Sequence, residues 1–153
     1  MLASLKLIDL VEKNSREIAQ DWANVVKKNG RTPHYHNLPV EELITRAVEF
    51  YRQLRNLLMS SNTFEDSQAY FLKYARICYD EGIPLHEAVY ALVLMRRQMW
   101  LFAEFQATFV TVVEQHQAIE SISRTILVID YAVYKITQHY LELMSREKSA
   151  SRK

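Results

Sequence analysis

The last third of the chain carries an unbroken repeat of apolar residues at alternating intervals of three and four. No Gly or Pro interrupts the repeat between positions 119 and 143. Because the spacing averages about 3.5 residues, it gives a helix one continuous apolar face that packs against another long helix. We therefore predict a long last helix at about 117–146 with a dimer and signalling seam formed by Ile119, Ile122, Ile126, Ile129, Val133, Ile136, Tyr140 and Leu143.

A second apolar set covers much of the remaining circumference of this helix. A helix that is apolar on two sides can bury one side in the core of its own domain and the other against a second copy of the chain. The sequence leaves open which face forms the dimer seam, since both faces are apolar. The second set consists of Leu127, Val128, Tyr131, Ala132, Tyr134 and Leu141.

Four further helices are predicted from apolar periodicity and from the residues that interrupt it. Gly82 and Pro84 mark the end of one helix and the start of the next, and a loop is expected at 29–38. The β-branched segment 109–113 is expected to form a turn or a short helix, because a lone strand has no partner. The basic tail at 146–153 is expected to fray. The predicted helices lie at about 4–28, 39–60, 64–81 and 84–106.

The composition indicates an all-α fold in a single domain covering residues 1–153. Apolar residues make up 49% of the chain, but it has only two Gly and three Pro, which favours a few long helices over a many-stranded sheet. The net charge is +1 and is spread evenly, which argues against a nucleic-acid partner. The N-terminus does not resemble a signal peptide and no apolar run is long enough to cross a bilayer. We expect a cytoplasmic protein without a membrane partner.

The polar residues form no recognisable catalytic constellation. The single cysteine, Cys78, is followed by Asp80 and Glu81, whose negative charges would disfavour a thiolate. His34 and His36 lie two apart, but no second pair of ligands is spaced to complete a metal site. No histidine has a glutamate three positions before it, as a di-iron bundle requires. We expect no catalytic residues, no bound metal and no enzymatic activity.

Aromatic residues in the third and fourth predicted helices suit a ligand pocket. Buried tyrosines need partners for their hydroxyls, so several that converge on one cavity would form an apolar pocket with polar groups. The alternative is that these tyrosines lie at the core boundary with their hydroxyls in water. An arginine beside a tryptophan could also clamp an anion. The candidate pocket residues are Tyr70, Tyr74, Leu92, Arg96 and Trp100.

Three segments of the chain carry a family resemblance: 18–22 (IAQDW), 35–43 (YHNLPVEEL) and 79–92 (YDEGIPLHEAVYAL), the last closing on Met95-Arg96-Arg97. Together they resemble the N-terminal domain of RsbT co-antagonist proteins, the RsbR-type sensors of bacterial stressosomes. The resemblance covers nearly the whole chain, and its motifs are structural rather than catalytic. It implies a globin-like bundle of about five helices that usually lacks haem, forms a homodimer and passes a signal through its last helix.

The resemblance also implies a place in bacterial stress signalling, with a signalling output domain or output protein as partner. The chain stops at Lys153 without an output domain. We therefore expect either that it is a fragment of a longer protein or that it acts on a separate partner.

Two alternatives stand beside the non-haem sensor. A haem-binding gas or redox sensor needs a histidine that points into a helical pocket. The predicted helix at 64–81 has none, and His86 is the best remaining candidate ligand, although we expect it to face solvent. A ligand-free structural adaptor would need only a docking surface and would have a solid core. A sensor would instead have a cavity lined by Tyr70, Tyr74, Leu92 and Trp100.

Overall fold

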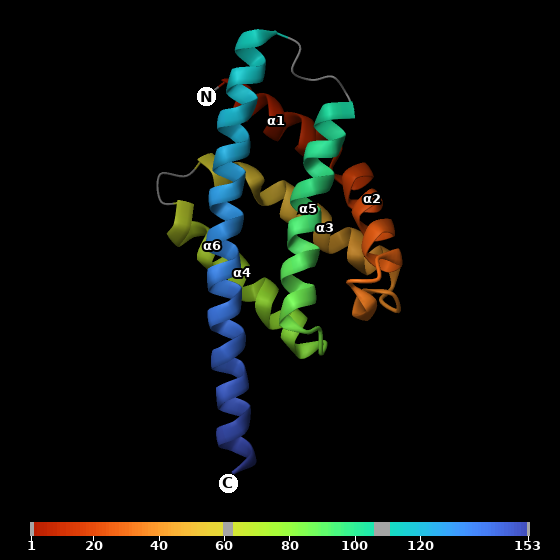
Figure 1. The fold of residues 1–153 in the computed structure, drawn as a ribbon, viewed down its shortest axis with the longest axis vertical. Coiled ribbons are helices and arrows are strands. Elements are labelled where there is room, and N and C mark those ends of the chain that lie inside the picture. Colours follow the sequence, from red (N-terminus) through yellow and green to blue (C-terminus); the bar gives the residue numbers. More distant parts are fainter. Residues whose placement is uncertain (1, 60–62, 106–110, 153) are drawn as a thin grey trace.

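The computed structural model describes residues 2–59, 63–105 and 111–152, and all regular structure in these residues is helical (Figure 1). This confirms the predicted all-α bundle with a long C-terminal helix. No helix among these residues combines the length and the apolar character needed to cross a bilayer. The elements are α1 (Leu2–Lys13), α2 (Ser15–Lys28), the 3-10 helix η1 (Pro33–Tyr35), α3 (Val40–Met59), α4 (Thr63–Asp80), α5 (Leu85–Phe105) and α6 (Val112–Ser151).

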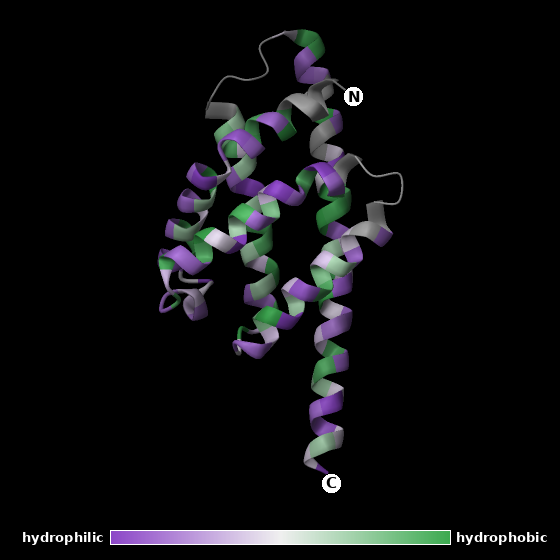
Figure 2. Cartoon of the chain, turned by 180° about the vertical axis from the view of Figure 1, so that it is seen from behind, coloured by the Kyte–Doolittle hydropathy of each residue, from purple (hydrophilic) through white to green (hydrophobic). Residues whose placement is uncertain are grey.

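The 40-residue helix α6 runs the length of the molecule, and its C-terminal end projects beyond the other helices (Figure 1). α4 packs along α6, and α1 and α5 also contact it. α2 packs against α3 and α5. Buried side chains from all six α-helices form the core between them. Seen from behind, hydrophobic and hydrophilic residues alternate along α6 down to its C-terminal end (Figure 2).

The first predicted helix is divided at Asn14 into α1 and α2. Backbone hydrogen bonds continue across this residue, because its N–H donates to the Leu10 carbonyl and its carbonyl accepts from the Ile18 N–H, both at 3.1 Å. The Asn14 side chain also donates to the Leu10 carbonyl, at 2.8 Å, and competes with the backbone for that acceptor. The resulting bend lets α1 pack on α6 while α2 packs on α3 and α5.

The turn between α4 and α5 matches its prediction from Gly82 and Pro84. Gly82 has a φ of 74°, in the left-handed region, and its N–H donates to the Tyr79 carbonyl at 3.0 Å. The N–H of Ile83 donates to the Cys78 carbonyl, also at 3.0 Å. These two bonds form a Schellman motif, which satisfies the last carbonyls of α4 before Pro84 begins the next helix.

Both ends of α6 differ from the prediction. The helix begins at Val112, because Thr111 and Glu114 form a capping box: the Thr111 hydroxyl accepts from the Glu114 N–H, and the Glu114 carboxylate accepts from the Thr111 N–H, each at 3.1 Å. Residues 112 and 113 are therefore helical despite their β-branched side chains, while 106–110 lie outside the described residues. At the other end α6 continues past the predicted end at about 146 to Ser151, through good helix formers without Gly or Pro.

Three aromatic side chains tie their helices to α5 by donating hydrogen bonds to its backbone carbonyls. The donors come from α2, α3 and α4, and the acceptors lie three or four residues apart on one side of α5. The buried Tyr51 and Tyr74 hydroxyls thus bind backbone oxygens, so for Tyr74 the predicted alternative of a hydroxyl in water does not hold. The pairs are Trp22 to Ala91 at 2.9 Å, Tyr51 to Met95 at 2.8 Å and Tyr74 to Ala88 at 2.7 Å.

Candidate ligand cavity and signalling helix

A small cavity lies between α3 and α4, above residues of α2, η1 and α5. Its volume is about 30 Å³, which is enough for about two water-sized positions. One wall is a single face of α4, because residues three or four apart share one side of a helix. α4 contributes Tyr70, Lys73, Tyr74, Ile77 and Cys78, α3 contributes Arg46 and Glu49, and the rest of the lining is Trp22, Tyr35 and Met95.

The buried end of the cavity carries neutral polar groups. The Tyr35 hydroxyl lies 4.0 Å from the Cys78 sulfur, and Tyr74 donates its hydrogen to the Ala88 carbonyl. Burial raises the pKa of the Cys78 thiol from its usual value of 9.0 to about 11. Burial also raises the pKa of Tyr35 and of Tyr74 well above 10.0. All three groups are therefore uncharged at neutral pH.

Charged residues surround the solvent end of the cavity. Lys73 Nζ lies 3.1 Å from a carboxylate oxygen of Glu49, and both side chains are exposed to solvent. Arg46 is half-buried and donates to the carboxylates of Glu42, at 2.5 Å, and of Glu81, at 2.8 Å. Each of these two cations already has a carboxylate partner, so neither offers an unpaired positive charge to a ligand.

The structure places two of the five predicted pocket residues, Tyr70 and Tyr74, in the cavity wall. Leu92 is fully buried in the core of α5, Arg96 is half-buried on the same helix, and Trp100 packs against the core, but none of these three lines the cavity. The predicted set thus joined residues of α5 that do not line this cavity, whereas Met95 of the same helix does.

Sequence reasoning missed the other eight lining residues, among them Trp22, Tyr35 and Met95. Trp22 lies in a helix that was assigned only a packing role, and Tyr35 lies in a segment that was predicted to be a loop. Tyr35 is 1% exposed, so η1 carries a core residue rather than only surface residues. Its position between two histidines gave no signal of burial, whereas the apolar spacing around Trp22 did.

This cavity has neither the volume nor the lining of a haem pocket. Pockets for ligands of drug or cofactor size have volumes of about 300–1,000 Å³, far above this cavity. None of its lining residues is a histidine, and His86 is exposed in the first turn of α5, as expected. Among the described residues, no group of three or more His, Cys, Asp or Glu side chains is placed to hold a metal ion.

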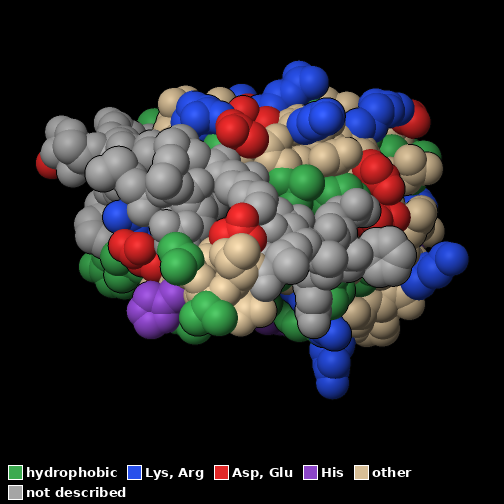
Figure 3. All heavy atoms as spheres, turned by 90° about the horizontal axis from the view of Figure 1, so that it is seen from above, with side chains coloured by type: hydrophobic (Ala, Val, Ile, Leu, Met, Phe, Trp, Pro, Cys, Tyr) green, Lys and Arg blue, Asp and Glu red, His purple; other side chains and the backbone are tan. Residues whose placement is uncertain are grey.

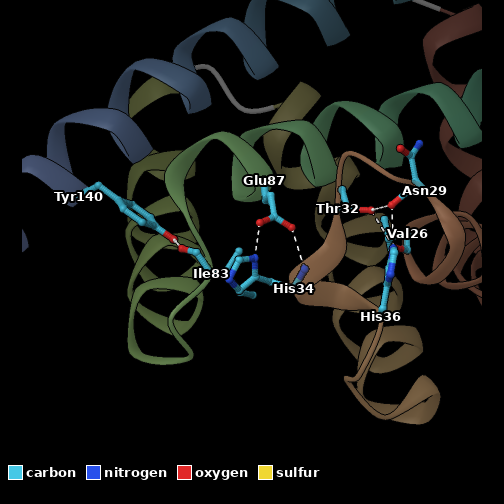
Figure 4. A network of polar contacts seen from close by, with 8 residues as sticks. All are labelled: Val26, Asn29, Thr32, His34, His36, Ile83, Glu87 and Tyr140. Carbon is cyan, nitrogen blue, oxygen red and sulfur yellow. Dashed lines mark hydrogen bonds and ion pairs between the residues drawn. The ribbon is translucent and has the colours of Figure 1, made fainter.

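A buried carboxylate, which the sequence analysis did not identify, joins η1 to α5. Glu87 is 1% exposed, and its carboxylate accepts a hydrogen bond from the backbone N–H of His34 at 2.9 Å and contacts the His34 imidazole Nδ1 (Figure 4). Buried charges in proteins are paired in this way because their desolvation is costly. Since His34 precedes Tyr35, the contact fixes the position of a cavity residue relative to α5.

Half of the predicted seam on α6 is buried in the core of the same chain. Val133 is half-buried against that core, whereas Ile119 and Ile126 are 60% and 40% exposed, and the side chain of Ile122 lies outside the described residues. The eight positions do not stay on one side, because a straight helix drifts by about 20° per heptad from a 3.5-residue repeat. The buried members are Ile129, Ile136, Tyr140 and Leu143.

The opposite side of α6 exposes a row of apolar residues that we call the outer face, defined by Leu127, Tyr134 and Leu141. These residues recur at intervals of seven and are 55%, 60% and 59% exposed. At about 100° per residue they lie on the side opposite the fully buried Ala132. All three belong to the second apolar set of the sequence, whereas Val128 and Ala132 of the same set are buried in the core.

α4 connects the cavity to α6. Cys78 lines the cavity, and the next residue, Tyr79, packs its ring edge-on against the Tyr140 ring of α6, with centroids 5.4 Å apart. The Tyr79 hydroxyl donates to the Glu147 carboxylate near the projecting end of α6. Tyr140 in turn donates its hydroxyl hydrogen to the Ile83 carbonyl, at 2.9 Å, in the turn that follows α4 (Figure 4).

Basic and acidic side chains are interspersed on the face seen from above (Figure 3). Several of the charged groups on the surface are paired, as in Arg16 with Glu41 at 3.1 Å and Arg55 with Asp9 at 2.5 Å. A nucleic-acid interface typically gathers basic residues into one patch or stripe. The face in Figure 3 does not show such a patch.

Comparisons with known proteins leave the family open. No family model, no curated protein and no solved structure matches the chain.

Proposed function

We propose that this chain is a non-catalytic sensory or regulatory domain that forms a homodimer through the outer face of α6 and relays changes in its core along that helix. The observation that supports this proposal most strongly is that α6 is apolar on two opposite sides. One side is buried in the domain core and the other is exposed over at least two heptads. A helix in this position contacts the core and a second copy at the same time.

The outer face suits a second copy of the same chain. Pairing about a two-fold axis brings the same patch of both copies together, so a self-complementary apolar row is sufficient. Residues at intervals of seven return to one side of a helix and allow side-chain interdigitation between two long helices. Leu127, Tyr134 and Leu141 have this spacing. Exposed apolar residues that gather on one side of a helix can mark an interaction surface.

The relay follows from the position of α4. This helix forms a wall of the cavity with Tyr74 and Cys78 and contacts α6 with Tyr79. A change at the cavity that shifts α4 would therefore alter its packing on α6. A ligand can cause such a shift only if it binds one arrangement more tightly than the other.

The resemblance to RsbR-type stressosome sensors supports a place in bacterial stress signalling, with a globin-like, non-haem domain in the cytoplasm. In this proposal the projecting end of α6, beyond Leu143, delivers the signal to an output domain or an output protein. Residues 144–151 are helical and exposed there, which suits a connection to a further partner.

Replacing Leu127 by Asp tests the dimer. The wild-type chain is expected to scatter light as a particle of twice its 18.0 kDa mass, and the Leu127→Asp variant as a particle of 18.0 kDa. The variant should keep its helical circular dichroism, because the side chain is already 55% exposed. The matched control is Val40→Asp on α3, where the side chain is 39% exposed, and this variant should remain dimeric.

The proposal fails if the wild-type protein is monomeric at the concentrations used. It also fails if the Leu127→Asp and Tyr134→Asp variants both remain dimeric, because the interface would then lie elsewhere.

A further inference from the structure

The cavity between α3 and α4 combines a small volume with polar groups that face it from several elements. Its volume of about 30 Å³ corresponds to about two water-sized positions, so only a very small molecule fits without a rearrangement. Its lining surface is mostly apolar, and Trp22, Ile77 and Met95 contribute to it from three different helices. These two properties already exclude a cofactor and a fatty chain as occupants of this arrangement.

The polar groups in the cavity select for an uncharged occupant. Tyr35 and Cys78 are neutral at pH 7, because burial raises the pKa of both groups. Arg46 and Lys73 at the solvent end are bound to carboxylates. A charged molecule would lose its hydration in this cavity without gaining an unpaired counter-charge, which is costly.

A hydrogen-bonding occupant is favoured over a purely apolar one. The Tyr35 hydroxyl has a hydrogen-bonding interaction with the Tyr74 hydroxyl and lies 4.0 Å from the Cys78 sulfur, which is a weak hydrogen-bonding partner. An oxygen atom placed in the cavity can therefore offer this hydroxyl a better partner than the sulfur. The apolar lining on the other side accommodates a methyl or methylene group.

We propose that the cavity is a binding site for a small uncharged molecule with one hydrogen-bonding oxygen and one short apolar end, of the class of the lowest alcohols. Tyr35 provides the polar contact, and Ile77 and Met95 provide the apolar contact. This inference rests on the proposed sensory function in one respect, because it names the class of molecule to which the domain would respond. The binding itself requires only one chain.

Methionine methyl groups report on this site directly in nuclear magnetic resonance spectra. Met95 lines the cavity, Met99 is buried in the same helix but does not line it, and Met144 is exposed on α6. Ethanol added to the full chain with ¹³C-labelled methionine methyls should shift the Met95 signal along a saturating curve. The Met99 and Met144 signals should move only slightly and in proportion to concentration. Bulkier tert-butanol and charged acetate should not produce a saturating Met95 shift.

Two pairs of variants separate recognition by hydrogen bonding from recognition by size. Tyr35→Phe removes the proposed donor and should weaken ethanol binding about tenfold, which corresponds to the loss of one hydrogen bond. Its control, Tyr140→Phe, removes a buried hydroxyl outside the cavity and should leave the affinity unchanged. Ile77→Phe fills the cavity from a half-buried position and should abolish saturation, whereas Val48→Phe, also half-buried but outside the cavity, should not.

The results distinguish this inference from the proposed function. A Met95 shift that is not saturable, or that tert-butanol reproduces, overturns the binding site. A saturable shift that survives Ile77→Phe overturns it as well, because the binding would then occur elsewhere. If light scattering shows a monomer and ethanol still saturates the Met95 signal, the binding site stands and only the dimeric relay is overturned.

Discussion

The two apolar faces of α6 lie on one helix but differ in what covers them. Ile136 on the inner face is 0% exposed and Tyr134, two residues before it, is 60% exposed. The inner face is covered by α4, α1 and α5, whereas no described part of the chain covers the outer face. Apolar periodicity therefore identifies a helix face that can be buried, but which part of the molecule covers that face depends on where the other helices pack.

Substitutions on the two faces should therefore have different consequences. A change on the inner face removes contacts within the chain and should lower the free energy of unfolding. A change on the outer face should leave folding intact and affect association.

The largest expected effect is that of Ile136→Asp. The substitution removes a fully buried side chain and places a carboxylate without a partner in the core, at a cost of more than about 4 kcal/mol. Single domains have total stabilities of about 5–15 kcal/mol, so the variant should be largely unfolded at 37 °C. Circular dichroism during heating measures this. The matched variant Tyr134→Asp on the outer face should melt within a few degrees of the wild-type monomer.

If both aspartate variants fold equally well, the assignment of the inner face is wrong. If both unfold, Tyr134 is buried against another part of the chain, and the distinction between the faces is lost.

The reactivity of the buried Cys78 thiol in α4 should show the next largest effect. Its pKa is raised from 9.0 to about 11 by burial, which lowers the thiolate fraction at pH 8 about a hundredfold. Since the thiolate is the reactive form, alkylation by iodoacetamide should be at least that much slower in the folded chain than in guanidinium chloride. Mass spectrometry of timed samples measures both rates. Equal rates would show that the cysteine is exposed.

The same raised pKa makes stability depend on pH. The folded state favours the protonated thiol of Cys78. The contribution of this thiol to stability is therefore complete below pH 9.0 and is lost as the pH rises from 9.0 to about 11. Tyr35 and Tyr74 act in the same direction at higher pH, because burial raises their pKa values too. Urea unfolding at pH 8 and pH 10 should show the decrease, and Cys78→Ser should make it smaller.

The smallest expected effect is a difference in the free energy of unfolding between variants of two tyrosines of α6. Tyr140→Phe on the inner face removes the hydrogen bond to the Ile83 carbonyl and should lower the free energy of unfolding by about 1 kcal/mol. Tyr134→Phe on the outer face should change it by less than about 0.5 kcal/mol. Urea denaturation of both variants gives the comparison. A loss at Tyr134 as large as that at Tyr140 would contradict the assignment of the two faces.

Local sequence signals predicted most of the helices. Gly82 was expected to end α4 in the left-handed conformation and does so, because only a residue without a Cβ adopts that conformation at little cost. The capping box of Thr111 and Glu114 was also present in the sequence, but the β-branched residues around it were given more weight, and the predicted start of α6 was too late. The bend at Asn14 was missed because no Gly or Pro marks it in the sequence of the first predicted helix.

The cavity was predictable only in part. Tyr70 and Tyr74 were proposed from their spacing on α4, and both line it. Leu92 and Trp100 were included because they lie on an apolar helix, but spacing within one helix does not show which of its sides faces a neighbouring helix. Tyr35 and Glu87 could not be assigned, since their burial depends on contact between η1 and α5, which are distant in the sequence.

The sequence by itself determined the helices, their main stop signals and the two apolar faces of the last helix, because these depend on residues within a few positions of one another. Only the tertiary structure decided which face of α6 enters the core, which residues enclose the cavity and which carbonyls of α5 accept the aromatic hydrogen bonds. These features depend on the bend at Asn14 and on how α4 and α5 pack against α6. Helix packing is set by contacts between residues far apart in the chain, and a local pattern does not contain them.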